Sequence, residues 1–193
     1  MAYAGQIITN PVSGETFEFL QTANDTDGEL LAFNLTLTPD GKVPGAHVHP
    51  EQEESFKVLS GTMKFKLGHR TIIASEGQTV VVPAGKRHRF SNAGDEDAYV
   101  RVEVRPALRM EELFETTVAL AEEGRVLRSG MPKPLELVLF VRQYAREVRA
   151  PFPPAWVVRA TTAPVAALAR RLGRGERYRR ATPAYGSVAV ATA

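Results

Sequence analysis

Short apolar stretches alternate with turn residues over residues 1–106, a pattern that indicates β structure. The stretches are rich in Val, Ile, Phe and Thr, and Gly, Pro, Asn and Asp separate them. We predict strands at Ile7–Thr9, Phe17–Gln21, Leu30–Thr38, Ser55–Leu59, Thr62–Leu67, Thr71–Ala74, Thr79–Val82, His88–Ser91 and Tyr99–Val104. Many short strands with closely spaced turns favour a sandwich or a barrel.

The residues within single strands alternate in polarity, which assigns their faces. Val100, Val102 and Val104 fall on one face of the last strand and are expected to point into the core. By the same rule, if Glu54 points inward, Phe56 points inward as well and Ser55 points outward.

The pattern changes to helical spacing after Pro106. We predict helices over residues 109–123, 135–148 and 155–172, the last of them interrupted near Pro164 because proline lacks a backbone N–H. The second helix is so apolar that it must pack on the barrel or against a second subunit. The predicted organisation is a β domain at residues 1–106 and a helical C-terminal extension with a basic tail at 107–193.

Composition excludes several classes of function. The 193 residues include no cysteine, so a disulfide, an iron–sulfur cluster and a cysteine nucleophile are all impossible. No apolar run approaches the roughly 20 residues of a membrane span, and the N-terminus lacks the basic and apolar regions of a signal peptide. These features are those expected of a cytoplasmic protein.

Positive charge gathers near the end of the chain. Residues Arg170–Arg180 include six arginines and one glutamate, although the net charge of the chain is only +2. Binding of this segment to nucleic acid or to an anionic surface is one hypothesis. We favour a solvated tail, or one that contacts an acidic surface of a partner subunit, because Tyr178 alone is available for stacking.

Two glycine-containing stretches hold the candidate chemistry. They supply His47, His49, Glu54 and His88, three imidazoles and one carboxylate that suit a single transition-metal ion. His47 and His49 leave one strand on the same face because side chains at i and i+2 point the same way. Antiparallel pairing of the second stretch would place His88 beside them. Iron, manganese, nickel, zinc and copper all fit this ligand set.

Other residues near these stretches receive different assignments. Glu53 is the alternative carboxylate ligand to Glu54, Glu51 and Gln52 are expected to be solvated turn residues, and His69 to be an exposed turn residue. Four phenylalanines are candidates for an aromatic substrate pocket, although plain core packing explains each equally well: Phe33, Phe56, Phe65 and Phe90.

The spacing of both stretches resembles the paired motifs of the cupins. The first motif is matched by Gly41, His47, His49, Glu54 and Gly61, and the second by Gly77, Pro83, Gly85, His88 and Asn92. The six-residue gap before Gly61 fits Glu54 and not Glu53. The resemblance covers about residues 30–105, and the short interval between the motifs is similar to that of the compact, single-domain microbial cupins. It implies an all-β, double-stranded β-helix (jelly-roll) barrel and, by sheet pairing between subunits, a homodimer.

The resemblance says less about the reaction, because one fold hosts many activities. The ligand set is similar to that of quercetin and acireductone dioxygenases, which implies a metal-dependent oxidoreductase that acts on a small organic substrate. The alternative is a non-catalytic module that binds a small molecule or a metal and uses the helical extension to contact a partner.

Overall fold

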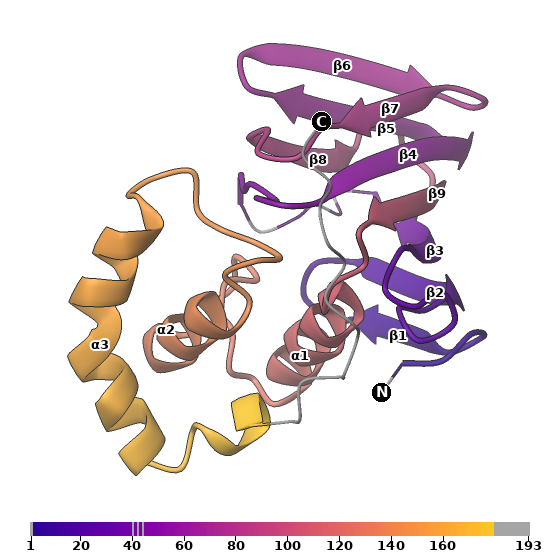
Figure 1. Ribbon diagram of the computed structural model, residues 1–193. Helices are drawn as coiled ribbons and strands as arrows, with labels where there is room; N and C mark the ends of the chain where they lie inside the picture. The colour runs from indigo at the N-terminus through magenta and orange to yellow at the C-terminus, as the bar shows by residue number, and fades with distance from the viewer. Residues whose placement is uncertain (1, 40, 42, 44, 180–193) are drawn as a thin grey trace.

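The computed structural model describes residues 2–39, 41, 43 and 45–179, so residues 180–193 of the predicted tail lie outside it. The described residues form a β domain followed by a group of helices on one side of it (Figure 1). The strands are β1 (Ile7–Asn10), β2 (Glu15–Gln21), β3 (Leu31–Leu37), β4 (Glu53–Ser60), β5 (Thr62–Leu67), β6 (Arg70–Ser75), β7 (Thr79–Val82), β8 (His88–Asn92) and β9 (Ala98–Arg105). The helices are α1 (Met110–Glu122), α2 (Pro134–Gln143), α3 (Ala155–Arg171) and the short 3-10 helix η1 (Glu176–Arg179).

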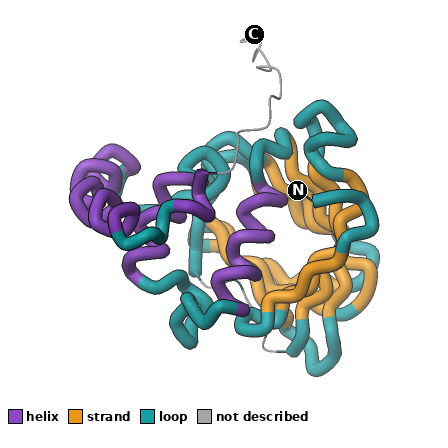
Figure 2. The backbone as a smooth tube through the Cα atoms, turned by 90° about the horizontal axis from the view of Figure 1, so that it is seen from below, coloured by secondary structure: helices purple, strands orange, loops and turns teal. Residues whose placement is uncertain are grey.

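The strands make two antiparallel sheets. The larger has the order β1-β2-β3-β9-β4-β7 and the smaller the order β6-β5-β8. Seen from below, the strands curl around a common interior, while the helices gather at one side (Figure 2). Buried residues alternate along β9 and β4 as the sequence predicts. The predicted fold class, a jelly-roll β domain with a C-terminal helical extension, is confirmed.

The turn between β4 and β5 shows why glycine is needed there. Gly61 adopts φ +80°, in the left-handed region that other residues rarely occupy. A Cβ atom at this position would also lie 2.9 Å from the Cα of Ala98. The tight connection lets β4 and β5 enter different sheets and closes the first predicted motif.

Helix α1 covers the β1–β3 end of the larger sheet. Its Phe114 stacks on Phe17 of β2 with ring centroids 4.5 Å apart, and it contacts Phe33 of β3 edge-on at 5.2 Å. The helical extension therefore shares an aromatic core with the β domain.

Two predictions about the helices were wrong in detail. Helix α2 ends at Gln143, and not at residue 148, because Tyr144 turns inward and the chain after it pairs with the β domain through an antiparallel bridge between Val48 and Arg149. Helix α3 continues through Pro164 without interruption. Pro164 lies on the exposed side of the helix, where water can bond the carbonyl that it leaves unpaired.

The apolar helix α2 is buried within the chain. Leu139 and Phe140 belong to the core, and the helix lies between α1 and α3 (Figure 1). The sequence left open packing on the barrel or against a second subunit, whereas the structure packs this helix mainly against α3 of the same chain. Among the described residues, no helix combines the length and the apolar character that a membrane crossing demands.

Candidate metal centre

Backbone pairing brings the two histidine-bearing stretches together. His47 and His88 form an antiparallel bridge in which each N–H donates to the other's carbonyl at 2.9 Å. Gly85 N–H, in the turn before β8, donates to the carbonyl of His49 at 2.7 Å. The local pairing thus brings the three imidazoles together, with ring centroids 4.4 to 5.2 Å apart.

The larger sheet supplies the carboxylate. Glu54 lies opposite Val82 of β7 and Val104 of β9, and it is buried, whereas its neighbour Glu53 is exposed. Its Oε2 lies 2.9 Å from Nε2 of His88 and 3.4 Å from Nε2 of His49. Each of His47, His49, Glu54 and His88 offers one ligand atom, and these atoms lie within 4.8 Å of one another. We call these four residues the His/Glu cluster.

Each imidazole of the cluster is oriented through its other ring nitrogen. Nδ1 of His47 contacts the carbonyl of Gly45 at 3.0 Å, Nδ1 of His88 that of Lys86 at 3.0 Å, and Nδ1 of His49 that of Glu147 at 2.5 Å. A carbonyl oxygen only accepts, so in a neutral ring the proton sits on Nδ1 and the lone pair on Nε2. Outer hydrogen bonds of this kind fix the tautomer of metal-binding histidines.

The cluster also leaves buried polar atoms without a hydrogen-bond partner of good geometry. They are Nε2 of His49, Nε2 of His88 and Oε2 of Glu54. Burying polar atoms unsatisfied costs free energy, and such atoms in a native fold require an explanation. A metal ion bound by all three atoms supplies one, so the residues fit a transition-metal ion.

The pKa values reflect the crowding of these groups. Burial would raise the pKa of Glu54, but the neighbouring imidazoles outweigh it and lower that pKa to about 2. Burial, together with the charges of the other two imidazoles, lowers the pKa of His47 to about 3. Burial also works to lower the pKa of His88, yet its contact with Glu54 prevails and leaves that pKa raised. The site therefore favours an ionised Glu54, whereas the raised pKa of His88 favours its protonated form. That proton must leave before His88 can bind a cation.

The helical extension contributes a group that the sequence did not reveal. The carbonyl that accepts from His49 belongs to Glu147, 98 residues further along the chain. Residues 144–149, which we call the strap, are held there by the Val48–Arg149 bridge and by an exposed ion pair between Arg146 and Glu51 at 2.6 Å. A backbone carbonyl has no sequence signature, so no pattern could have found it.

Gln52 was assigned wrongly as a solvated turn residue. It is 0% exposed, and its Nε2 donates to the carbonyls of Pro106 and Ala107 at 3.0 Å each. These bonds attach the start of β4 to the chain that leaves β9. Gln52 thus fixes the entrance to the strand that carries Glu54.

The four candidate pocket phenylalanines fall into two groups. Phe56, Phe65 and Phe90 pack against one another with ring centroids 5.2 to 6.2 Å apart. Phe33 packs instead with Phe17, Phe19 and Phe114. All four are 8% exposed or less. His69 lies exposed in the turn between β5 and β6, apart from the cluster.

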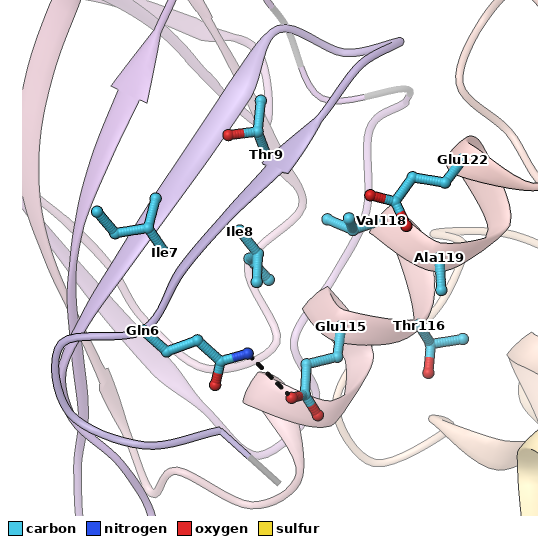
Figure 3. Close-up of a pocket in the computed structure, with 9 residues that line it drawn as sticks. All are labelled: Gln6, Ile7, Ile8, Thr9, Glu115, Thr116, Val118, Ala119 and Glu122. Atoms are coloured by element: carbon cyan, nitrogen blue, oxygen red, sulfur yellow. Dashed lines mark hydrogen bonds between the residues drawn. The ribbon is translucent and has the colours of Figure 1, made fainter.

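A separate hollow of about 410 Å³ lies between β1 and α1 (Figure 3). Ile8 of β1 and Val118 of α1 line it, and Gln6 Nε2 donates to Glu115 Oε1 across one end at 3.5 Å. Its lining includes no member of the His/Glu cluster and none of the four phenylalanines, so it is not part of the candidate metal centre.

Comparison with known proteins identifies the β domain. Residues 33–104 match the family described as Cupin domain. A 64-residue segment is 34% identical to the protein named polyketide synthase CurC from Streptomyces cyaneus, and the match covers 33% of this chain and 42% of that relative. The chain therefore spans less than half the length of the curated relative that it matches.

Two solved structures resemble about half of this chain. A protein described as a predicted oxalate decarboxylase from Thermotoga maritima is 19% identical with a TM-score of 0.47, over 55% of this chain and 99% of that one. The Cnp3 cupin domain of Schizosaccharomyces pombe is 15% identical with a TM-score of 0.44, over 53% and 71% of the two chains. The family match is thus confined to residues 33–104, which lie within the two-sheet β domain and include all four residues of the His/Glu cluster.

Proposed function

We propose that this protein is a metal-dependent oxidoreductase of the dioxygenase type that acts on a small organic molecule. His47, His49, Glu54 and His88 would hold one divalent transition-metal ion: iron, manganese, nickel, zinc or copper. The observation that carries the proposal is the convergence of four ligand atoms within 4.8 Å, three of them buried without a hydrogen-bond partner. Cytoplasmic location and homodimer formation are proposed with it.

The residues of the chain have separate tasks in this proposal. The carbonyls of Gly45, Lys86 and Glu147 hold the three rings with Nε2 free. Glu54 contributes one negative charge, which partly neutralises a divalent cation. Such an ion, when bound, supplies a Lewis acid for a substrate oxygen or a binding site for dioxygen.

Access to the centre is proposed to lie at His47. It is the half-buried member of the cluster, while His49, Glu54 and His88 are buried. A substrate would therefore reach the cluster over His47. The buried rings of Phe56, Phe65 and Phe90 would keep water away from the other side.

One observation favours the alternative, a non-catalytic module that binds a metal or a small molecule. The four phenylalanines considered for a substrate pocket are packed in the core at 0 to 8% exposure. They would have to move to admit an apolar substrate. A module that only holds a metal needs no such movement.

The test is to purify the full chain without an affinity tag or added metal and to measure its metal content. The metal-free protein is then loaded with each candidate ion, and oxygen uptake is followed with flavonoid, diketone and acireductone substrates. The variant His49→Gln should lose the metal, and His69→Gln, which changes the exposed histidine outside the cluster, should retain it.

The outcomes separate the two proposals. Oxygen uptake with one of the loaded ions, lost in His49→Gln, supports the oxidoreductase. Stoichiometric metal without uptake for any ion and substrate supports the module. Failure of every ion to bind would refute the oxidoreductase and the metal-binding module, and would leave only a module that binds a small molecule.

A further inference from the structure

Helix α3 turns large apolar side chains toward solvent. Of its seventeen residues only Ala166 and Ala169 are buried. Trp156 is 73% exposed, Leu168 50% and Leu172, directly after the helix, 58%. Phe152, in the loop before the helix, is 81% exposed. In Figure 1 the helix stands on the far side of α2 from the β domain, and no other described helix or strand covers its outer side.

The exposed large apolar side chains are concentrated in this segment, whereas a surface helix normally buries such side chains. Among the described residues, five of the eleven large apolar side chains that are exposed lie between residues 152 and 172. A helix at the surface of a globular protein ordinarily buries its large apolar residues and exposes polar ones. Here small alanines face α2, and the tryptophan and leucines face outward. The outer face of α3 therefore has the composition of a surface that is covered by something else.

The charge of the same segment limits what can cover it. From residue 150 to residue 175 the sequence contains no Asp or Glu. Of its four arginines, Arg159, Arg170 and Arg171 are exposed, whereas Arg174 is half-buried and forms an ion pair with Glu136. Two of them, Arg159 and Arg170, also line a pocket of about 270 Å³ between α2 and α3, together with Arg142. Three guanidinium groups at one pocket suit a phosphate or a carboxylate.

A second copy of the chain fits this face poorly. In a two-fold arrangement the same patch meets itself, so arginines would face arginines with no acidic residue of α3 to pair with them. An anionic surface has the opposite charge along its whole extent. The combination of Trp, Phe and Leu with flanking arginines and no acids is typical of helices that lie in a membrane interface.

We propose that α3 and the loop before it form an interfacial segment that binds anionic lipid surfaces. Phe152, Trp156, Leu168 and Leu172 would enter the boundary between headgroups and acyl chains, and Arg159, Arg170 and Arg171 would contact lipid phosphates and carboxylates. At 1.5 Å per residue the helix offers a contact about 25 Å long. This inference concerns a surface other than the metal centre and stands independently of the proposed reaction.

The chain offers a direct probe, because Trp156 is its only tryptophan. The full-chain protein is titrated with vesicles of phosphatidylcholine alone, or with about one-third phosphatidylserine, while Trp156 emission and co-sedimentation are recorded. We expect a blue shift and co-sedimentation with the anionic vesicles, and little of either with the neutral ones. The binding should weaken steeply as salt rises.

Variants of exposed residues separate the two contributions without threatening the fold. Arg159→Gln and Arg170→Gln should each weaken binding to anionic vesicles roughly fivefold. Leu168→Ala with Leu172→Ala should reduce the blue shift. Ile73→Ala is the matched control, because Ile73 is 53% exposed on β6 and outside the segment; its binding should equal that of the wild type.

Three results would overturn the proposal. One is unchanged Trp156 emission with anionic vesicles. Another is a blue shift that appears with rising protein concentration alone, accompanied in sedimentation by a dimer that Leu168→Asp dissociates, since a second copy would then cover the face. The third is an equal shift with soluble polyglutamate, which would assign the face to acidic protein segments.

Discussion

Replacing Tyr144 tests whether the helical extension positions a ligand of the metal centre. Tyr144 begins the strap and is 1% exposed. Its hydroxyl lies 2.8 Å from Oγ1 of Thr116 in α1, its ring centroid lies 5.0 Å from that of Phe140, and the guanidinium of Arg109 lies 5.6 Å above it. These contacts fix the origin of the segment whose Glu147 carbonyl accepts from His49.

The contacts allow the size of each effect to be worked out. Tyr144→Phe loses the hydrogen bond between the hydroxyl and Thr116 and the longer one that the hydroxyl donates to the carbonyl of Glu112 at 3.3 Å. Together these cost about 1–2 kcal/mol of unfolding free energy. Tyr144→Ala also removes the ring from the core, and a cavity of that kind costs about 3–5 kcal/mol. If the strap then leaves His49, the affinity for metal should fall roughly 10–100-fold, as it does when a group that orients a ligand is removed.

The ion pair between Arg146 and Glu51 provides the matched control. It also joins the strap to the β domain, but its side chains are 64% and 41% exposed. Exposed ion pairs contribute about 0–1 kcal/mol because water and salt screen them. Arg146→Ala should therefore leave both the stability and the metal affinity close to those of the wild type.

The assay is titration of the metal-free variants with Zn²⁺ in a calorimeter, since zinc binds such donors without redox chemistry. Circular dichroism at the same temperature establishes that each variant is folded. A folded Tyr144→Ala protein that binds Zn²⁺ as tightly as the wild type would show that the strap does not position His49.

Three further predictions concern single positions of the β domain. Glu54→Gln should weaken Zn²⁺ binding by more than the roughly 10–100-fold expected when an orienting group is lost. Glu53→Gln changes an exposed neighbour and should leave Zn²⁺ binding unchanged; calorimetry measures both affinities. Gly61→Ala should cost about 1–3 kcal/mol from its left-handed backbone alone, with more from the approach to Ala98, and should lower Tm by several degrees. Burial raises the pKa of Glu15 above its ordinary 4.5, so the unfolding free energy should fall as pH rises from 4.5 through the folded-state pKa, and Glu15→Gln should remove that fall in denaturant titrations at successive pH values.

The period-2 geometry of strands explains why so much of the β domain could be predicted. Side chains two apart share a face, so apolar alternation located β5 and β7 at the bounds that the structure has. The same rule placed Glu54 with Phe56. His47 and His49 do come together, but isolated bridges hold their segment and the predicted strand is not formed there. Turn residues completed the prediction, because the conformation of Gly61 is one that few other residues adopt.

The helical extension was harder to predict because tertiary contacts outweigh local preference there. The sequence from 135 to 148 is apolar enough to continue as a helix, yet the chain leaves the helix at Tyr144 to bury that ring and to pair beside Val48. In α3 the predicted bounds lie close to the observed ones, although the helix is not interrupted at Pro164, and the sequence could not tell which side faces α2. Alanines at 166 and 169 occupy that side, and periodicity does not distinguish a small buried face from a large exposed one.

The contact between Glu147 and His49 also determines how the non-catalytic alternative should be tested. Removing everything after Arg105 is the simplest way to ask whether the extension binds a partner. That truncation would also remove the carbonyl that accepts from His49, the Phe114 ring that stacks on Phe17, and the carbonyls that hold Gln52. Loss of function in the truncated protein would therefore follow from a damaged metal centre as readily as from a lost partner. Substitutions on the outer face of α3 leave these contacts in place, so only they can separate a role in partner binding from a role in building the site.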